Sequence, residues 1–472
     1  LSGTIAPVMP PKFSLKNSAF VIENYHQARP FSSFLPGISG LFGKPMWVFY
    51  TNRGQCISSF GVRNKNGAML EFYPANKAYA MTPLLGFRTF LRLSIGTKTI
   101  FYEPFATHAG SECRQSLSIR PHEIELEETH RDLGLRIRVV YFNAPNEELP
   151  VLLREVQVEN LRGQTLKGDL VDGLPQIVPF GLNEYLLKHM SRTMEAFAEV
   201  PHAEEKLPFY KLKTEPSDKP EVHWIEGGFF SFTMLNGQCL DILVDPEILF
   251  GQETSFQYPV LFASGRPITL KGQHIESSFA SAFAYTPISI AARQSIKLCS
   301  FYGQAESWPE AYSFRQRVQS SPSYGELKKV ENATFISEVA DAFAIHTGSP
   351  VLDAYHRQTY LDNVLRGGQP VLFRDQNKTQ LYHAYSRKHG DMERDYNFFE
   401  VSPNYFSQGN GSFRDVNQNR RSETFLQVGV GSSNVDTFFD LLQLDGFNPL
   451  VFQYEKYGVK GKYVRPGDLF EK

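Results

Sequence analysis

The sequence predicts a chain that is β first and α afterwards: a large antiparallel β-sandwich, a helical linker, and the beginning of a helical domain. Three observations lead to this prediction. Short runs of β-branched and aromatic residues, separated by turn residues, recur over roughly the first 300 residues. Near residue 320 the apolar residues take up helical spacing. The chain has 472 residues, which is too long for one ordinary core.

The first part of the chain carries the signals of half-buried strands. Residues 135–141 alternate apolar and basic side chains, as a strand with one wet face does. Turn signals at residues 52–54 and 64–67 separate neighbouring runs. We expect one antiparallel sandwich over residues 1–305. Its further predicted strands are residues 45–51, 98–102, 152–159, 227–233, 239–244 and 289–302.

Helical patterns occur within the sandwich and dominate after it. The charged, Pro-containing residues 201–221 predict a loop. Pro350 lies just inside the start of one helical run and Gly367 follows its end, as helix boundaries require. We expect a linker over residues 306–340 and a helical domain from residue 341 to residue 472. The predicted helices are residues 183–198, 309–320, 324–337, 349–365 and 438–450.

Composition and charge exclude several classes of function. The net charge is −2, so no basic excess is present to bind a nucleic-acid backbone. No stretch of about 18 apolar residues predicts a membrane span. The first 20 residues lack the charged and apolar regions of a signal peptide. We therefore expect a cytoplasmic protein with no nucleic-acid or membrane partner.

Cysteine and histidine spacing predicts neither a disulfide framework nor a metal site. The four cysteines are far apart and form no Cys-x-x-Cys or Cys/His cluster, and the histidines of the helical part lack i, i+4 spacing. We expect buried free thiols, no metal and no cofactor. The residues concerned are Cys56, Cys113, Cys239, Cys299, His346, His356, His383 and His389.

One group of segments resembles the sandwich of a known enzyme family. Residues 34–41 read Phe-Leu-Pro-Gly-Ile-Ser-Gly-Leu, and residues 71–79 read Glu-Phe-Tyr-Pro-Ala-Asn-Lys-Ala-Tyr. With residues 20–25, 45–55, 59–61, 155–160 and 171–175, they resemble the start of the sandwich in glycoside hydrolase family 94 phosphorylases. The similarity is greatest to the 1,2-β-oligoglucan phosphorylase branch. The resemblance implies a galactose mutarotase-like sandwich in front of an (α/α)6 barrel.

A second pair of segments, residues 394–400 and 411–418, carries the same resemblance. The run Arg414-Asp415 with Gln418 three residues later matches a motif early in the family's barrel. The resemblance implies that Asp415 binds hydroxyls of the sugar beside the broken bond, with Arg414 and Gln418 shaping the turn. A carboxylate can accept two such hydrogen bonds, strengthened by its charge. The alternative is an Arg–Asp pair that only ties a loop to a helix.

Two positions depart from the cellobiose phosphorylase pattern. Gly409 stands where those enzymes have Arg, and Asn419 stands where they have Asp. Both differences favour the β-1,2 branch. The resemblance also implies that the general acid and the phosphate-binding residues come later, downstream of Lys472, so we expect no catalytic residue in this chain and no activity of the chain alone.

A site with paired carboxylates was also considered. The segment that holds Asp391, Glu393, Asp395 and Glu400 also holds Arg387, Lys388 and Arg394. Carboxylates interspersed with basic residues favour a solvated charged loop over a catalytic pair.

The resemblance implies inverting phosphorolysis, in which inorganic phosphate is the co-substrate and the products are α-glucose 1-phosphate and a shortened β-glucan oligosaccharide. It also implies a homodimer, or association with a C-terminal catalytic polypeptide. Residues 34–43 and 172–181 are candidate rim loops, although structural turns are the favoured interpretation of both. Two further hypotheses stay open: a related hydrolase or transglycosylase, and a non-catalytic glucan-binding or assembly module.

Overall fold

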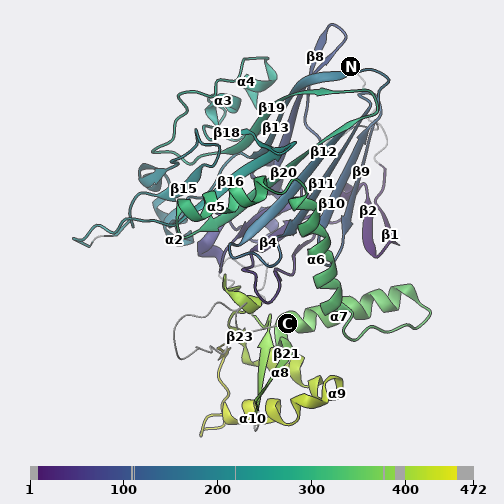
Figure 1. Ribbon diagram of the computed structural model, residues 1–472, viewed down its shortest axis with the longest axis vertical. Coiled ribbons are helices and arrows are strands. Elements are labelled where there is room, and N and C mark those ends of the chain that lie inside the picture. Colours follow the sequence, from purple (N-terminus) through teal and green to yellow (C-terminus); the bar gives the residue numbers. More distant parts are fainter. Residues whose placement is uncertain are drawn as a thin grey trace.

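The computed structural model describes residues 9–107, 110, 112–217, 219–375, 378–387 and 399–453. Figure 1 shows a β-rich body in the upper part, with α5 and α6 against its strands and the segments from α7 to α10 below it. The described chain is mostly antiparallel β-sheet with a helical region after it, so the coarse β-then-α prediction is confirmed.

The largest sheet has 11 strands, and its ladders are antiparallel. In spatial order its path is β1 (Lys12–Lys16), β2 (Ala19–Glu23), β9 (Cys113–Ile119), β10 (Ile124–His130), β11 (Leu135–Asn143), β12 (Val151–Asn160), β20 (Ser295–Ala305), β16 (Gly228–Leu235), β15 (Phe209–Leu212) and β14 (Ala198–Glu199), with β17 (Gln238–Cys239) paired to β16.

Two smaller sheets lie beside it. The five-stranded sheet has the order β18 (Asp241–Leu243), β19 (Ala282–Ile290), β13 (Leu166–Leu174), β7 (Arg88–Ile95) and β8 (Lys98–Tyr102). The four-stranded sheet has the order β3 (Ser32–Phe34), β4 (Trp47–Thr51), β5 (Ile57–Gly61) and β6 (Ala68–Leu70). One buried apolar cluster takes side chains from all three sheets, which makes this body a sandwich with a shared core.

Four helices accompany the sandwich in the described residues, and the three longest helices, α5 to α7, come directly after it. The first group is α1 (Ala75–Leu85), α2 (Glu184–Met190), α3 (Glu247–Phe250) and α4 (Val260–Ala263). The helices after the sandwich are α5 (Trp308–Gln319), α6 (Tyr324–Ala340), α7 (Pro350–Gly367), α8 (Phe413–Arg420), α9 (Glu423–Leu426) and α10 (Ser433–Asp440). Two two-stranded sheets accompany them: the hairpin of β21 (Gln369–Asp375) and β22 (Lys378–Ala384), and the pair of β23 (Gly411–Ser412) with β24 (Val451–Phe452), which are distant in sequence.

The interior of the sandwich contains a fully buried ion pair that joins two sheets. Arg154 of β12 donates to Asp172 of β13 at 2.6 Å through Nη2 and 3.1 Å through Nε, and both side chains are 0% exposed. Arg154 also donates to Gln55 at 2.7 Å and to the Tyr141 hydroxyl. Because the Asp172 carboxylate and these further acceptors surround the guanidinium of Arg154, its charge is compensated within the core.

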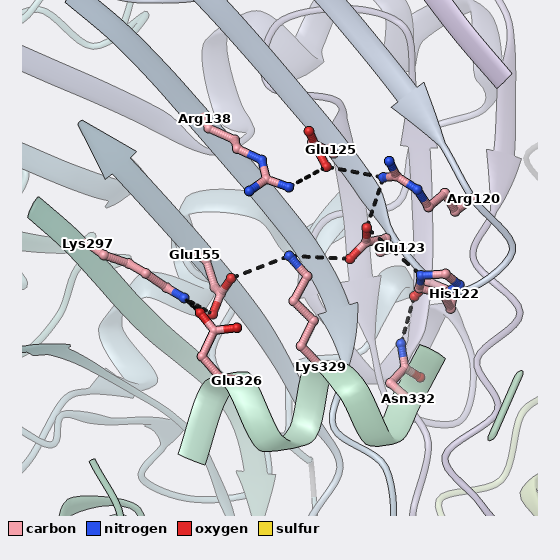
Figure 2. Close-up of polar contacts among 10 residues, drawn as sticks. All are labelled: Arg120, His122, Glu123, Glu125, Arg138, Glu155, Lys297, Glu326, Lys329 and Asn332. Atoms are coloured by element: carbon pink, nitrogen blue, oxygen red, sulfur yellow. Dashed lines mark hydrogen bonds and ion pairs between the residues drawn. The ribbon is translucent and has the colours of Figure 1, made fainter. Parts of the chain in front are cut away.

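Helix α6 is held on the large sheet by a polar network (Figure 2). The Lys329 ammonium of α6 lies 3.6 Å from Glu123 and 3.7 Å from Glu155. Glu123 directly precedes β10, and Glu155 is on β12. Lys297 of β20 binds Glu155 at 2.8 Å, and Asn332 donates to the His122 carbonyl at 2.8 Å. These contacts fix the helix from which the chain continues to α7.

Several element predictions were wrong in detail. Residues 201–221 contain strand β15, in which the buried Phe209 and Tyr210 pair with β16 and the buried Leu212 pairs with β14. Residues 289–302 form two strands, the end of β19 and β20, separated by a turn in which Arg293 has φ 60°. The helix predicted over 438–450 instead runs from Ser433 to Asp440, and Gly446 lies beyond it with φ 85°.

The region after α7 does not confirm an (α/α)6 barrel. Helix α7 is followed by the β21–β22 hairpin and then by short helices, whereas a barrel opening predicts paired long helices. The helices predicted at 309–320, 324–337 and 349–365 are present as α5, α6 and α7. The domain boundaries at residues 305 and 340 stay predictions. Within the described part of the chain, no helix combines the length and the apolar character needed to cross a membrane.

Candidate functional site

Helix α8 places the predicted sugar-binding residue in its first turn. Ser412 is the N-cap, and its hydroxyl accepts the backbone N–H of Asp415 at 3.3 Å. The first turn of a helix has unpaired N–H groups and the positive end of the helix dipole, so an acidic side chain is favoured there. The Ser-x-x-Asp sequence therefore sets both the start of the helix and the position of Asp415.

Asp415 is held in its ionised form. Arg414 donates to its Oδ1 through Nε at 3.1 Å and Nη2 at 3.0 Å. Burial alone would raise the pKa of Asp415, but the hydrogen bonds from Ser412 and Arg414 and the charges of Arg414 and Arg366 outweigh it, so the pKa lies below its ordinary value. At neutral pH the group is a hydrogen-bond acceptor, which suits a hydroxyl-bearing ligand.

Arg414 and Gln418 lie in different surroundings. The Arg414 side chain is 85% exposed and folds onto Asp415 from the solvent side. Gln418, one turn further along α8, lines a cavity of about 170 Å³ together with Tyr360 and Asn363 of α7. The structure thus brings Arg414 to Asp415, while Gln418 belongs to a neighbouring cavity that Asp415 does not line.

A buried carboxylate that sequence reasoning missed borders the same cavity. Glu423 accepts from Asn434 at 2.8 Å through Oε2, and the His383 Nε2 lies 2.8 Å from the same oxygen. The other oxygen, Oε1, is buried without a hydrogen-bond partner in the described residues. Burial and then the Glu423 charge raise the pKa of Tyr360 to about 12. The cavity is therefore bordered by a carboxylate whose orientation is fixed by hydrogen bonds. No motif around residue 423 predicts this from the sequence.

A larger cleft lies on the opposite side of α7. It has a volume of about 750 Å³, within the range of ligand sites in proteins. Residues of β2, the segment after β3, and α7 form its walls. Its lining includes the aromatic side chains Phe20, Phe34 and Tyr50. Arg366 of α7 lines this cleft, and its positive charge also lowers the pKa of Asp415, which does not itself line the cleft.

The charges of the large cleft are balanced and paired. Arg357 donates to Asp341 at 2.5 and 3.1 Å, and Arg366 donates to Asp362 at 3.0 Å. Three aspartates and three arginines line the cleft in all: Asp341, Asp353, Asp362, Arg120, Arg357 and Arg366. The cleft has no excess of positive or negative charge that would attract a polyanion or a polycation. The hydroxyl groups of an uncharged ligand can instead donate to the aspartates and accept from the arginines.

Arg387 corrects the expectation of a solvated charged loop. Its side chain is buried, 3% exposed, and Nη1 donates to the Gly37 carbonyl at 2.9 Å. Nε and Nη2 have no partner among the described residues, and burial lowers the pKa of Arg387 to about 9. Of the other charges in that run, Glu400 is partly buried. Lys388, Asp391, Glu393, Arg394 and Asp395 lie outside the described residues, as do His389 and most of segment 394–400.

The two candidate rim loops differ. Phe34, Leu35 and Pro36 line the large cleft, so the start of residues 34–43 reaches the candidate site. Residues 172–181 do not line it, and Asp172 is the buried partner of Arg154. The segments 155–160 and 171–175, which carry part of the resemblance, lie on β12 and at the end of β13.

The chain was compared with known proteins. No protein-family profile matches it, and a search of curated proteins finds no relative. Solved structures that align with it include a polysaccharide lyase (9% identity, 56% of this chain and 33% of that one, TM-score 0.33). They also include a putative kojibiose phosphorylase from the human microbiome (8%, 78% and 40%, TM-score 0.26) and a family GH92 α-mannosidase from Bacteroides thetaiotaomicron (8%, 82% and 43%, TM-score 0.21).

These structural neighbours are carbohydrate-active enzymes, and this chain spans less than half the length of each. TM-scores this low assign neither a family nor a linkage specificity. The functional proposal therefore depends on the residues of the large cleft and of α8.

Proposed function

We propose that this chain binds a β-glucan oligosaccharide and forms part of an inverting phosphorylase that acts on β-1,2-linked gluco-oligosaccharides. The observation that carries the proposal is the ionised Asp415 on α8, whose charge is stabilised by Arg366, a residue that lines an aromatic cleft with balanced charges. The β-1,2 linkage comes from the resemblance of the sequence, including Gly409 and Asn419.

The cleft offers the two kinds of contact that a sugar uses. Aromatic faces such as Phe20, which is 44% exposed, pack against the apolar C–H face of a pyranose ring. Carboxylates accept hydrogen bonds from its hydroxyls, and the negative charge strengthens them. Asp415 sits on a helix whose first turn is capped by Ser412, so its carboxylate is held in place before the ligand arrives.

The proposed reaction is a single displacement. A carboxylic acid protonates the glycosidic oxygen while inorganic phosphate attacks the anomeric carbon from the opposite face, which yields α-glucose 1-phosphate. No general base is required because phosphate is already the nucleophile, whereas hydrolysis requires a carboxylate that activates water. The general acid and the phosphate-binding groups are proposed to belong to a C-terminal catalytic portion. That portion is either covalently continuous with this chain or associated with it.

A binding experiment tests the part assigned to this chain. Isothermal titration with sophorotriose is expected to show binding, with cellotriose binding more weakly. Asp415→Asn keeps the shape but removes the charge, so it is expected to weaken sophorotriose binding at least tenfold, about 1.4 kcal/mol. Asp440→Asn changes an exposed carboxylate at the end of α10 and is the matched control. Equal affinities of the wild type and Asp415→Asn would contradict the assignment.

A second experiment separates the alternatives with the complete protein. Turnover of sophorose-type oligosaccharides is expected to stop when inorganic phosphate is removed and to release α-glucose 1-phosphate when phosphate is present. Equal turnover without phosphate would identify a hydrolase or transglycosylase. Binding without turnover in either condition would favour a glucan-binding or assembly module.

A further inference from the structure

Three side chains with different metal-binding atoms gather at one end of strands β9 and β10. They are Glu112, Cys113 and His130, and one donor atom of each lies within 4.8 Å of the other two. The sequence predicted no metal site, because Cys113 and His130 are 17 positions apart (130 − 113) and match no ligand motif. The pairing of β9 with β10 brings Cys113 and His130 together although they are far apart in sequence.

The ladder between β9 and β10 fixes two of the three residues. Cys113 and His130 are directly opposite each other and form the last pair of this antiparallel ladder. Directly opposite residues project from the same face of the sheet, with Cβ atoms about 4.5–5.5 Å apart. Glu112 precedes Cys113 in the turn before the strand, and the backbone N–H of Arg131 donates to its carbonyl at 3.0 Å. The turn is therefore tied to the same strand end.

The surroundings of the cluster are suited to a cation. The Cys113 side chain is buried, and His130 and Glu112 are partly buried. Burial and then the negative charges of Glu112 and Asp132 raise the pKa of the Cys113 thiol to about 11. The same two carboxylates act on His130. Arg131, which pairs with Asp132 at 3.1 Å, is exposed to solvent.

We propose that Glu112, Cys113 and His130 bind a zinc ion through a thiolate, an imidazole nitrogen and a carboxylate oxygen, with water as the fourth ligand. This set of sulfur, nitrogen and oxygen donors is typical of zinc, whereas magnesium and calcium take oxygen ligands. Binding transfers the thiol proton of Cys113 to solvent, and the sulfur lone pair forms the bond to the metal.

The geometry requires only small adjustments. Tetrahedral zinc with bonds of about 2.0–2.3 Å places its ligand atoms roughly 3.3–3.8 Å apart, so the cluster must contract by about 1 Å. The backbone N–H of Leu133 now donates to Nδ1 of His130 at 3.3 Å. If zinc binds Nδ1 it replaces this bond. If zinc binds Nε2, the ring proton moves to Nδ1 and the bond is also lost. Either way the cost is one long hydrogen bond.

Metal titrations of the whole chain test the site. Competition with a chromophoric chelator is expected to show one tightly bound zinc per chain, and cobalt is expected to give a thiolate-to-cobalt charge-transfer band. Cys113→Ser and His130→Gln are each expected to weaken zinc binding at least tenfold. Cys239→Ser is the matched control, because it removes a different free thiol, which is partly buried. This variant is expected to bind zinc as tightly as the wild type does.

A readout on the unmodified chain keeps the test decisive if Cys113→Ser fails to fold. Zinc is expected to slow the alkylation of Cys113 by iodoacetamide at least tenfold under mild denaturation, while the labelling of Cys239 stays the same. Absence of the charge-transfer band, or equal labelling of Cys113 with and without zinc, would overturn the proposal. So would undiminished zinc affinity in a folded Cys113→Ser variant.

Discussion

At the scale of single residues, Glu128 is a carboxylate on the buried face of its strand. Glu125 and Glu127 alternate with the apolar Ile124 and Leu126 on β10, and Glu128 is in phase with the apolar residues. The strand turns it inward, and burial raises its pKa to about 8 against the backbone hydrogen bond from Phe105 that lowers it. Its Oε2 accepts from Phe105 N at 2.7 Å and Gln115 Nε2 at 2.6 Å, and its Oε1 contacts the Tyr102 hydroxyl.

The raised pKa of Glu128 gives a prediction with a defined sign. Between pH 4.5 and about 8 the folded state holds a proton that the unfolded state has lost, so stability falls as pH rises through this window. Glu128→Gln is neutral at every pH and can make the same three contacts. We expect it to be more stable than the wild type at pH 8, by about 1–4 kcal/mol, and similar at pH 4.5. Thermal unfolding at both pH values measures this.

The control for Glu128 is the preceding residue. Glu127→Gln changes a partly exposed carboxylate on the opposite face of the same strand and is expected to leave the pH dependence as in the wild type. If Glu128→Gln and the wild type lose stability in parallel from pH 4.5 to pH 8, Glu128 is ionised in the fold and the interpretation is wrong.

At the scale of elements, one of the polar contacts that hold α6 on the sheet is a lysine placed between two nearly buried acids. Glu123 and Glu155 are 4% and 5% exposed, and Lys329 is the cation of α6 that lies near both (Figure 2). Removing the ammonium group leaves Glu123 with His122 and Arg120, and Glu155 with Lys297. Because each acid keeps at least one other cationic partner, the loss is smaller than that of an isolated buried charge.

Lys329→Met is therefore expected to lower the free energy of unfolding of α6 by about 1–2 kcal/mol, since it keeps the aliphatic stem and removes the charge. Hydrogen exchange of the amides of Tyr324–Ala340 measures this local opening. Glu338→Gln, on the exposed side of the same helix, should leave exchange unchanged. Unaltered exchange in Lys329→Met would show that Lys329 is not needed and that the other contacts of α6, such as that of Asn332 with the His122 carbonyl, hold it on the sheet.

At the scale of the whole molecule, the periodicity of apolar residues predicted that strands come first and helices follow. It did not predict which strands pair with which. The strands around residues 135–159 and helices α5–α7 follow from local patterns, because each buries one regular face. Strand β15 was missed because its burial comes from β16, which lies elsewhere in the sequence. At the candidate site, the motif singled out Asp415 from the sequence, and the Ser412 cap that positions it is also close in sequence. The surroundings of Glu423 and the lining of the cleft come from elements that are far apart in sequence. The local sequence around residue 423 therefore does not predict them.

The two largest sheets of the sandwich meet at Arg154 and Asp172, which leads to a prediction about the stability of the whole fold. Both residues are fully buried, one on β12 and the other on β13. Breaking a buried pair by removing one partner leaves the other charge without compensation and typically costs about 3–5 kcal/mol. We expect Arg154→Met to destabilise the sandwich by that amount, measured from the denaturant midpoint of unfolding. Arg138→Met, which removes a half-exposed partner of Glu125, is expected to cost less than about 1 kcal/mol.

A double replacement separates the charge from the packing. In Arg154→Met combined with Asp172→Leu no charge stays buried at this position, and apolar side chains fill part of the space between the sheets. We expect the double variant to recover more than half of the stability lost in Arg154→Met, because most of that loss is the isolated carboxylate. Recovery of none of it would mean that the hydrogen bonds of Arg154 to Gln55 and Tyr141, and not the compensation of Asp172, hold the two sheets together.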